Sequence, residues 1–112
     1  MVTHFDAGKH GYVLNYTINS LCSFEDRFQR DISDVISHPT FNNIRGAIWA
    51  GLIDQHPNLS LEETGRIIDE YLNEGERSLG DVLRLCAEAL TNSGFFQKAG
   101  KGPAAKKTKQ GK

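Results

Sequence analysis

Histidines and paired carboxylates, the residues most often used in catalysis and metal binding, are scattered along this chain. Structural zinc sites usually place their ligands within a few positions of each other. The chain has four histidines, His4, His10, His38 and His56. They are scattered, and three of the four flank turns or prolines. The members of each carboxylate pair are adjacent, so on a helix their side chains diverge by about 100°; these pairs are Glu25-Asp26, Glu62-Glu63 and Asp69-Glu70. We therefore expect no catalytic set, no metal and no cofactor.

The glycine-rich segment Gly8-Lys9-His10-Gly11 invites comparison with a phosphate-binding loop. It lacks the Gly-x-x-x-x-Gly-Lys-Ser/Thr spacing of such loops, and a strand pattern follows it instead of a helix pattern. We interpret it as a hairpin turn. The two cysteines, Cys22 and Cys86, each fall in a helical apolar pattern and have no partner at metal-ligand spacing. We expect both to be reduced and buried.

Three large aromatic residues are the candidates for binding a protein partner: Trp49, Phe95 and Phe96. Large aromatics are frequent anchors at protein interfaces. Each has a plainer alternative. Trp49 lies in the most apolar segment and suits core packing, and Phe95-Phe96 follow a glycine that ends a helix pattern, where they can fold back over the helix end.

Charge divides the chain into two parts. Residues 1–97 hold all 14 acidic residues and 7 of the 13 Lys and Arg, a formal charge of −7, whereas residues 98–112 hold six lysines and no acid. We predict one small domain over 1–97 and a disordered lysine-rich tail over 98–112. An acidic domain argues against specific nucleic-acid binding. The tail supports weak nonspecific attraction at most, or serves solubility.

No apolar run reaches the roughly 18 residues that span a membrane, so no membrane association is expected. The segment from Met1 to Lys9 shows no secretion signal. We therefore expect a cytoplasmic protein.

The hydrophobic pattern predicts a mainly α fold with a short N-terminal β element. Tyr12, Leu14 and Tyr16 alternate at period two, and residues 2–5 are the candidate partner strand of a hairpin. About four packed helices follow. The first begins after Thr17; its apolar residues Ile18, Leu21, Cys22 and Phe28 are expected to face inward, with Phe24 to one side.

The second helix, roughly 40–55, is predicted to be central. Its stripe contains Phe41, Ile44, Ala47, Ile48 and Leu52, and the small residues Gly46, Ala50 and Gly51 would let another helix approach closely. The third helix opens at the capping box Ser60-Leu61-Glu62-Glu63, and the fourth at Ser78. The core is expected to centre on Ile44, Ile48, Leu52, Ile68, Leu72, Leu83 and Leu90.

Taken in order, these elements resemble a known family. Gly8-Lys9 leads into the segment from Tyr12 to Glu25, Trp49-Ala50-Gly51-Leu52 follows within a helix, and Ser60-Leu61-Glu62-Glu63 opens the next. Over residues 8–92 this pattern is similar to the small tail assembly chaperones of long-tailed bacteriophages and the related tail proteins of gene transfer agents. The motifs are apolar patterns and one strand-to-helix junction, and they include no catalytic residue.

The resemblance implies a partner and a place of action. Proteins of this family are thought to coat the long tape measure protein in the host cytoplasm until tail tube subunits replace them, so the tube protein is a further candidate partner. The chaperone would be absent from the mature virion. Self-association and a frameshifted longer form stay open. Two alternatives remain: a structural tail subunit retained in the particle, and a nucleic-acid accessory protein that acts through its basic tail.

Overall fold

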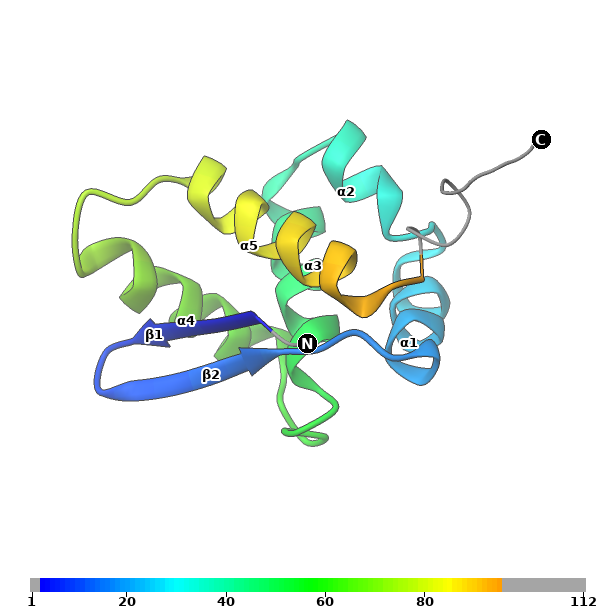
Figure 1. The fold of residues 1–112 in the computed structure, drawn as a ribbon, viewed down its shortest axis with the longest axis horizontal. Coiled ribbons are helices and arrows are strands. Elements are labelled where there is room, and N and C mark those ends of the chain that lie inside the picture. The colour runs from blue at the N-terminus through cyan, green and yellow to red at the C-terminus, as the bar shows by residue number, and fades with distance from the viewer. Residues whose placement is uncertain (1–2, 96–112) are drawn as a thin grey trace.

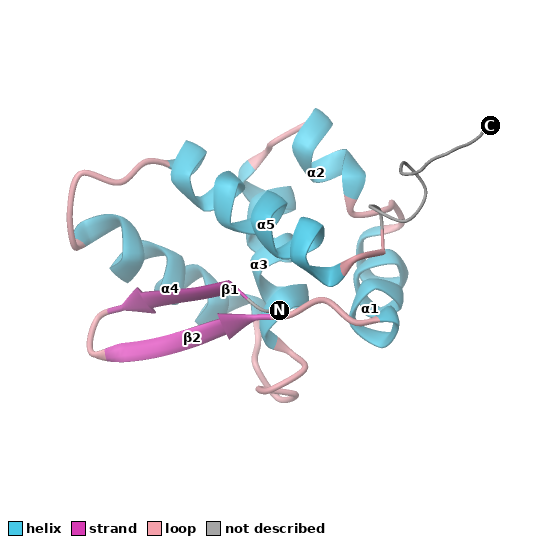
Figure 2. Cartoon of the chain, viewed as in Figure 1, coloured by secondary structure: helices cyan, strands magenta, loops and turns pink. Residues whose placement is uncertain are grey.

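The computed structural model describes residues 3–95, and within them a hairpin precedes five helices (Figures 1 and 2). The elements are β1 (Thr3–Ala7), β2 (His10–Leu14), α1 (Ile18–Phe28), α2 (Ser33–Ser37), α3 (Phe41–Leu52), α4 (Leu61–Asn73) and α5 (Leu79–Ser93). The predicted mainly α fold with an N-terminal β element is confirmed. The predicted tail lies outside the described residues. No helix in the described part is long and apolar enough to cross a membrane.

The hairpin is antiparallel, with Thr3 opposite Leu14 and Ala7 opposite His10. Its two-residue turn begins at Gly8, whose φ of +65° lies in the left-handed region that favours glycine. Alternate residues of β1 are buried, as expected of a strand with one covered face. That strand packs against α4 and α5, and the side-chain amide of Asn92 donates a hydrogen bond of 3.0 Å to the Thr3 hydroxyl. This packing and this hydrogen bond therefore join β1, the first described strand, to α5, the last described helix.

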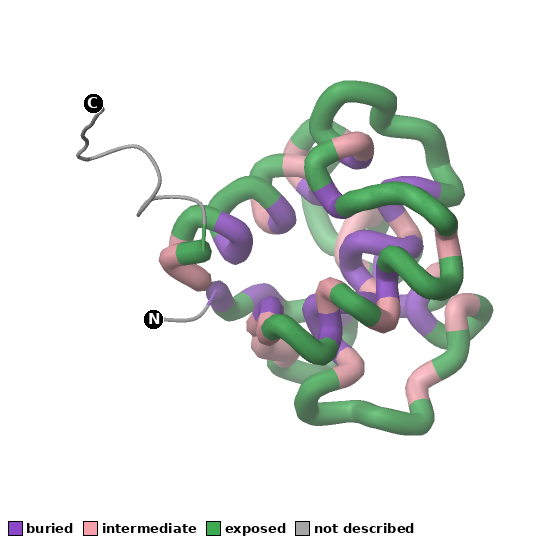
Figure 3. Tube along the Cα trace, turned by 90° about the vertical axis from the view of Figure 1, so that its right-hand side faces the viewer, coloured by how far each residue is buried: buried purple, intermediate pink, exposed green. Residues whose placement is uncertain are grey.

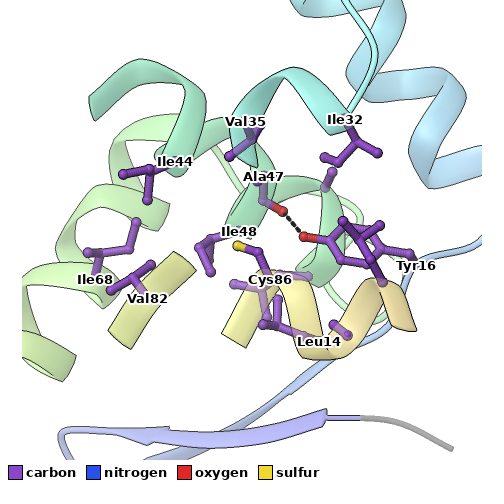
Figure 4. Packing of buried hydrophobic residues seen from close by; sticks show 14 of the residues in the cluster. Leu14, Tyr16, Ile32, Val35, Ile44, Ala47, Ile48, Ile68, Val82 and Cys86 are labelled. Carbon is purple, nitrogen blue, oxygen red and sulfur yellow. Dashed lines mark hydrogen bonds between the residues drawn. The ribbon is translucent and has the colours of Figure 1, made fainter. Parts of the chain in front are cut away.

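Helix α3 is central, as predicted, because it contacts α1, α2, α4, α5 and β2. Along the Cα trace, buried residues gather toward the middle of the molecule, and exposed ones make up most of its periphery (Figure 3). Five of the seven predicted core residues are buried: Ile44, Ile48, Leu52, Ile68 and Leu90. Leu72 and Leu83 are half-buried and pack against this cluster, part of which is shown in Figure 4.

Two glycines of α3 allow close packing, as the sequence suggests. A Cβ at Gly46 would lie 2.6 Å from Cζ of Phe28, so α1 can approach only because that side chain is missing. A Cβ at Gly51 would overlap Leu14. The neighbour at Gly51 is thus the end of β2 and not a helix.

The inward face of α1 differs from the prediction. Phe24 is fully buried beneath Gly46, whereas Ile18 is 60% exposed and Cys22 is exposed. The apolar spacing of Ile18 and Cys22 places them on one side of the helix, but α3 lies on the side that carries Phe24 and Phe28. The expectation that Cys22 is buried was therefore wrong, because contact with α3 decides which side faces inward.

The helix starts follow the predicted capping chemistry. Thr17 Oγ1 accepts a hydrogen bond from the Ser20 N–H, and Ser60 and Glu63 form the reciprocal capping box at 3.0 Å in both directions. The Ser78 N–H donates to the Asp81 carboxylate in the same way at 2.9 Å. The backbone N–H at each cap lowers the pKa of its carboxyl partner, Glu63 in α4 and Asp81 in α5.

Candidate partner-binding surface

Trp49 is held within the fold by contacts around its ring. It is half-buried, and its indole N–H donates a hydrogen bond of 2.9 Å to the carbonyl of Leu59. The edge of the Phe28 ring and the guanidinium of Arg27 lie against it, with the guanidinium carbon 5.6 Å from the ring centroid. Through these contacts, Trp49 connects the loop that follows α3 with α1.

The other two aromatic candidates lie at or beyond the end of α5. Phe95 follows Gly94, which ends the helix with φ +81°, and it is 39% exposed. Phe96 lies outside the described residues. The structure places no ring contact between Phe95 and Trp49, so these two candidates do not form one aromatic surface.

A second exposed aromatic residue, besides Phe95, marks a surface that sequence analysis missed. A groove of about 420 Å³ lies where α3, α4 and the start of α5 meet. Phe41 lines it and is 77% exposed, although the sequence pattern assigned it to the core stripe. The remaining apolar lining comes from Ile44 of α3, Ile68 and Leu72 of α4, and Leu79 of α5. We call this surface the α3–α4 groove.

Phe41 is exposed because it is the first residue of α3. Side chains on a helix tilt toward its N-terminus, so at the first position the ring extends past the helix start. Thr40 caps this helix by accepting the Asn43 N–H, which fixes the start there. The signal available in the sequence was a large aromatic residue directly after a capping threonine.

Charged residues surround the apolar lining of the α3–α4 groove. Arg45 belongs to α3, and Glu62, Arg66 and Asp69 belong to α4. Arg66 and Glu62 form an ion pair at 3.5 Å, with side chains 68% and 81% exposed. Such an exposed pair contributes little to stability, so its charges are available to a partner.

Gly65 keeps the groove open on the α4 side. A Cβ there would meet only Arg45 Cδ, at 3.5 Å, which is an ordinary van der Waals contact. The walls are thus helical, the lining is apolar and the rim carries charges of both signs. This arrangement suits the binding of a partner's apolar side chains.

The described part of the chain offers little reactive chemistry elsewhere. Within residues 3–95 no group of three His, Cys, Asp or Glu is placed to hold a metal ion. Cys86 is buried as predicted, and burial raises the pKa of its thiol to about 12. The neighbouring Tyr16 hydroxyl donates a hydrogen bond of 2.7 Å to the Ala47 carbonyl (Figure 4). Burial also raises the pKa of this tyrosine, so both groups stay uncharged at neutral pH.

A second hollow, of about 310 Å³, lies beside the start of α1 and is lined by Thr17, Ser20 and Asp54 among others. Three of its polar side chains already have partners: Thr17 and Ser20 cap α1 reciprocally, and Asp54 accepts from the Asn15 amide. The α3–α4 groove is therefore the better candidate site. No family model matches this chain, and searches of curated proteins and of solved structures returned no significant match.

Proposed function

We propose that this protein is a phage tail assembly chaperone without enzymatic activity. It binds the tape measure protein reversibly in the bacterial cytoplasm, keeps it from aggregating until the tail tube polymerises, and is absent from the finished particle. The observation that supports this best is the α3–α4 groove, an open apolar surface with Phe41 at its edge. The resemblance over residues 8–92 implies that the partner is the tape measure protein.

The groove has the properties that a temporary cover for apolar helices needs. An apolar lining attracts the stripes that make long helical proteins aggregate in water. The groove is also small: its volume of about 420 Å³ admits only a few partner side chains, whereas a typical stable interface involves roughly 20–30 residues on each side. A contact of this size favours an affinity low enough for tube subunits to displace the chaperone.

Co-expression with the tape measure candidate, the product of the downstream gene, tests the proposal. We expect the candidate to become soluble and to co-purify with this protein at low and at high salt. Apolar contact persists as salt rises, whereas attraction through the six tail lysines would be screened within about 8 Å at physiological ionic strength. The proposal fails if the candidate stays equally insoluble with and without this protein and no complex forms at either salt.

Two further measurements separate the alternatives. Mass spectrometry of purified particles should not detect the chain, whereas a structural tail subunit would be retained there. Removal of residues 98–112 should leave binding to the tape measure candidate intact, whereas an accessory protein that acts through its basic tail would lose its activity.

A further inference from the structure

We infer that the α3–α4 groove binds one amphipathic helix, with the helix's apolar stripe on the groove lining, its basic flank against α4 and its acidic flank against Arg45 of α3. The inference rests on the proposed function, since the helix would belong to the tape measure protein. Beyond that function, the inference specifies the binding surface, the helical conformation of the bound partner and the arrangement of the partner's charges.

The groove walls determine the conformation of the bound segment. They come from α3, α4 and the first turn of α5, and away from the helix starts at Phe41 and Leu79 the backbone groups of these walls are paired within their own helices. An extended segment would find few backbone partners there and would bury unpaired N–H and C=O groups, at a cost of roughly 1–3 kcal/mol for each fully desolvated group. A helix pairs its own backbone groups and brings only side chains to the lining.

The lining matches the spacing of a helical stripe. Ile68 and Leu72 are four positions apart on α4. Ile68 and Ile44 of α3 are buried beneath the groove, so the apolar surface that a partner reaches comes mainly from Phe41, Leu72 and Leu79. Side chains three or four positions apart on a partner helix also share one face. The volume of about 420 Å³ accommodates a few such side chains.

The rim determines the arrangement of charge. On the groove, α4 presents Glu62 and Asp69 against the single base Arg66, whereas α3 presents Arg45 and no acid. The two walls are therefore of opposite net sign. A partner helix with lysines along one flank and glutamates along the other can lie in the groove in either of two directions. In one of them its lysines face α4 and its glutamates face Arg45, so both walls are complemented. A helix with charges of the same sign on both flanks complements only one wall.

The probes are helical peptides of about four turns that share one leucine stripe. One has a lysine flank and a glutamate flank, one has two lysine flanks, and one has two glutamate flanks. Titration of the ¹⁵N-labelled full chain should shift the backbone amides of Phe41, Leu72 and Leu79. At physiological salt the mixed-flank peptide should bind most tightly.

A matched pair of variants tests the apolar contact. Phe41→Ser and Ile18→Ser both change an exposed first residue of a helix that a threonine caps, but only Phe41 lines the groove. Phe41→Ser should weaken binding of the mixed-flank peptide by about tenfold or more, as loss of an aromatic anchor does. Ile18→Ser should leave binding unchanged.

A second pair tests the charges. Asp69→Lys and Glu88→Lys change the net charge equally, and both residues are exposed, but Glu88 lies on α5 away from the groove lining. Asp69→Lys should weaken binding of the mixed-flank peptide by roughly threefold, which is the effect expected from loss of an exposed ion pair. The same variant should strengthen binding of the glutamate-flank peptide. Glu88→Lys should do neither.

Three results would overturn the inference: peptide-induced shifts outside the groove, equal effects of a variant and its control, or equal binding of all three peptides. Groove amides that shift with protein concentration before peptide is added would assign the groove to a second copy of the chain instead. The proposed function is judged separately. If Phe41→Ser leaves the co-expressed tape measure complex intact, the groove assignment fails and the chaperone function stands. If peptides bind the groove but the tape measure candidate stays insoluble, only the function fails.

Discussion

The two sides of α3 differ in whether an aromatic side chain fills the space beside a glycine. On the α1 side, Gly46 makes room for the rings of Phe28 and Phe24, whose centroids are 4.8 Å apart. On the α4 side, a Cβ at Gly65 would meet only Arg45 Cδ, and Phe41, which lines the same groove, is exposed to solvent. A glycine therefore gives close packing only where a neighbour supplies a side chain to fill the space. Where none does, a groove remains.

The largest effect should come from a fully buried residue of α3 itself. Ile48 is 1% exposed in the middle of α3. Ile48→Ala should lower the free energy of unfolding by about 2–5 kcal/mol, because it removes buried methyl groups and leaves a cavity. Urea unfolding followed by the fluorescence of the single tryptophan measures this. Ile36→Ala, at a residue 47% exposed, should change stability by no more than about 0.5 kcal/mol. Equal midpoints for the two variants would show that α3 is not central.

The next prediction tests the comparison directly, because replacing glycine with alanine should change the free energy of unfolding in opposite directions on the two sides. Gly46→Ala should destabilise the protein by about 1–3 kcal/mol, since its Cβ would overlap the Phe28 ring. Gly65→Ala should stabilise it by up to about 1 kcal/mol, since alanine favours a helix and its Cβ meets only Arg45 at an ordinary distance. Thermal unfolding of both variants measures the difference.

The wild-type chain and Gly75→Ala are the references for this pair, because a Cβ at Gly75 meets nothing within 4 Å and Gly75 lies outside the helices. If both helix variants stabilise the protein, the Phe28 ring does not fill the space beside Gly46, and the contrast between the two sides is lost.

The smallest effect concerns pH. The helices that form the open side, α4 and α5, begin with the capping carboxylates of Glu63 and Asp81, whereas α1 and α3 begin with the uncharged caps Thr17 and Thr40. The pKa of each carboxyl is lowered in the folded state, so the stabilisation that each contributes is present at neutral pH and is lost as the pH falls through that lowered pKa.

Amide hydrogen exchange in the first turns of α4 and α5 should therefore accelerate on acidification relative to the first turns of α1 and α3, after correction for intrinsic exchange. Glu63→Gln should remove this acid response from α4 alone, because glutamine keeps the capping geometry and does not titrate. An acid response that is uniform across all four helices would contradict the assignment to these caps.

Local patterns in the sequence were enough to predict the hairpin, the caps and the central helix. Ser60 and Glu63 were recognisable because a capping box depends on residues three apart. The burial of Phe24 and the exposure of Cys22 were not predictable, because several residues of α1 have helical spacing and only the approach of α3 selects the inward side. The groove was missed for the same reason, since three separate helices line it.

The hydrogen bond between Asn92 and Thr3 joins positions 89 residues apart, and the strand that it anchors packs against α5. During synthesis β1 leaves the ribosome before α1 to α4, and its partner helix α5 follows only after them. Until then the inner face of the hairpin, with Phe5 and Leu14, lacks part of its cover. A chain arrested in the loop between α4 and α5 would thus present an apolar strand to its neighbours on a polysome, and synthesis of α5 is the event that ends this exposure.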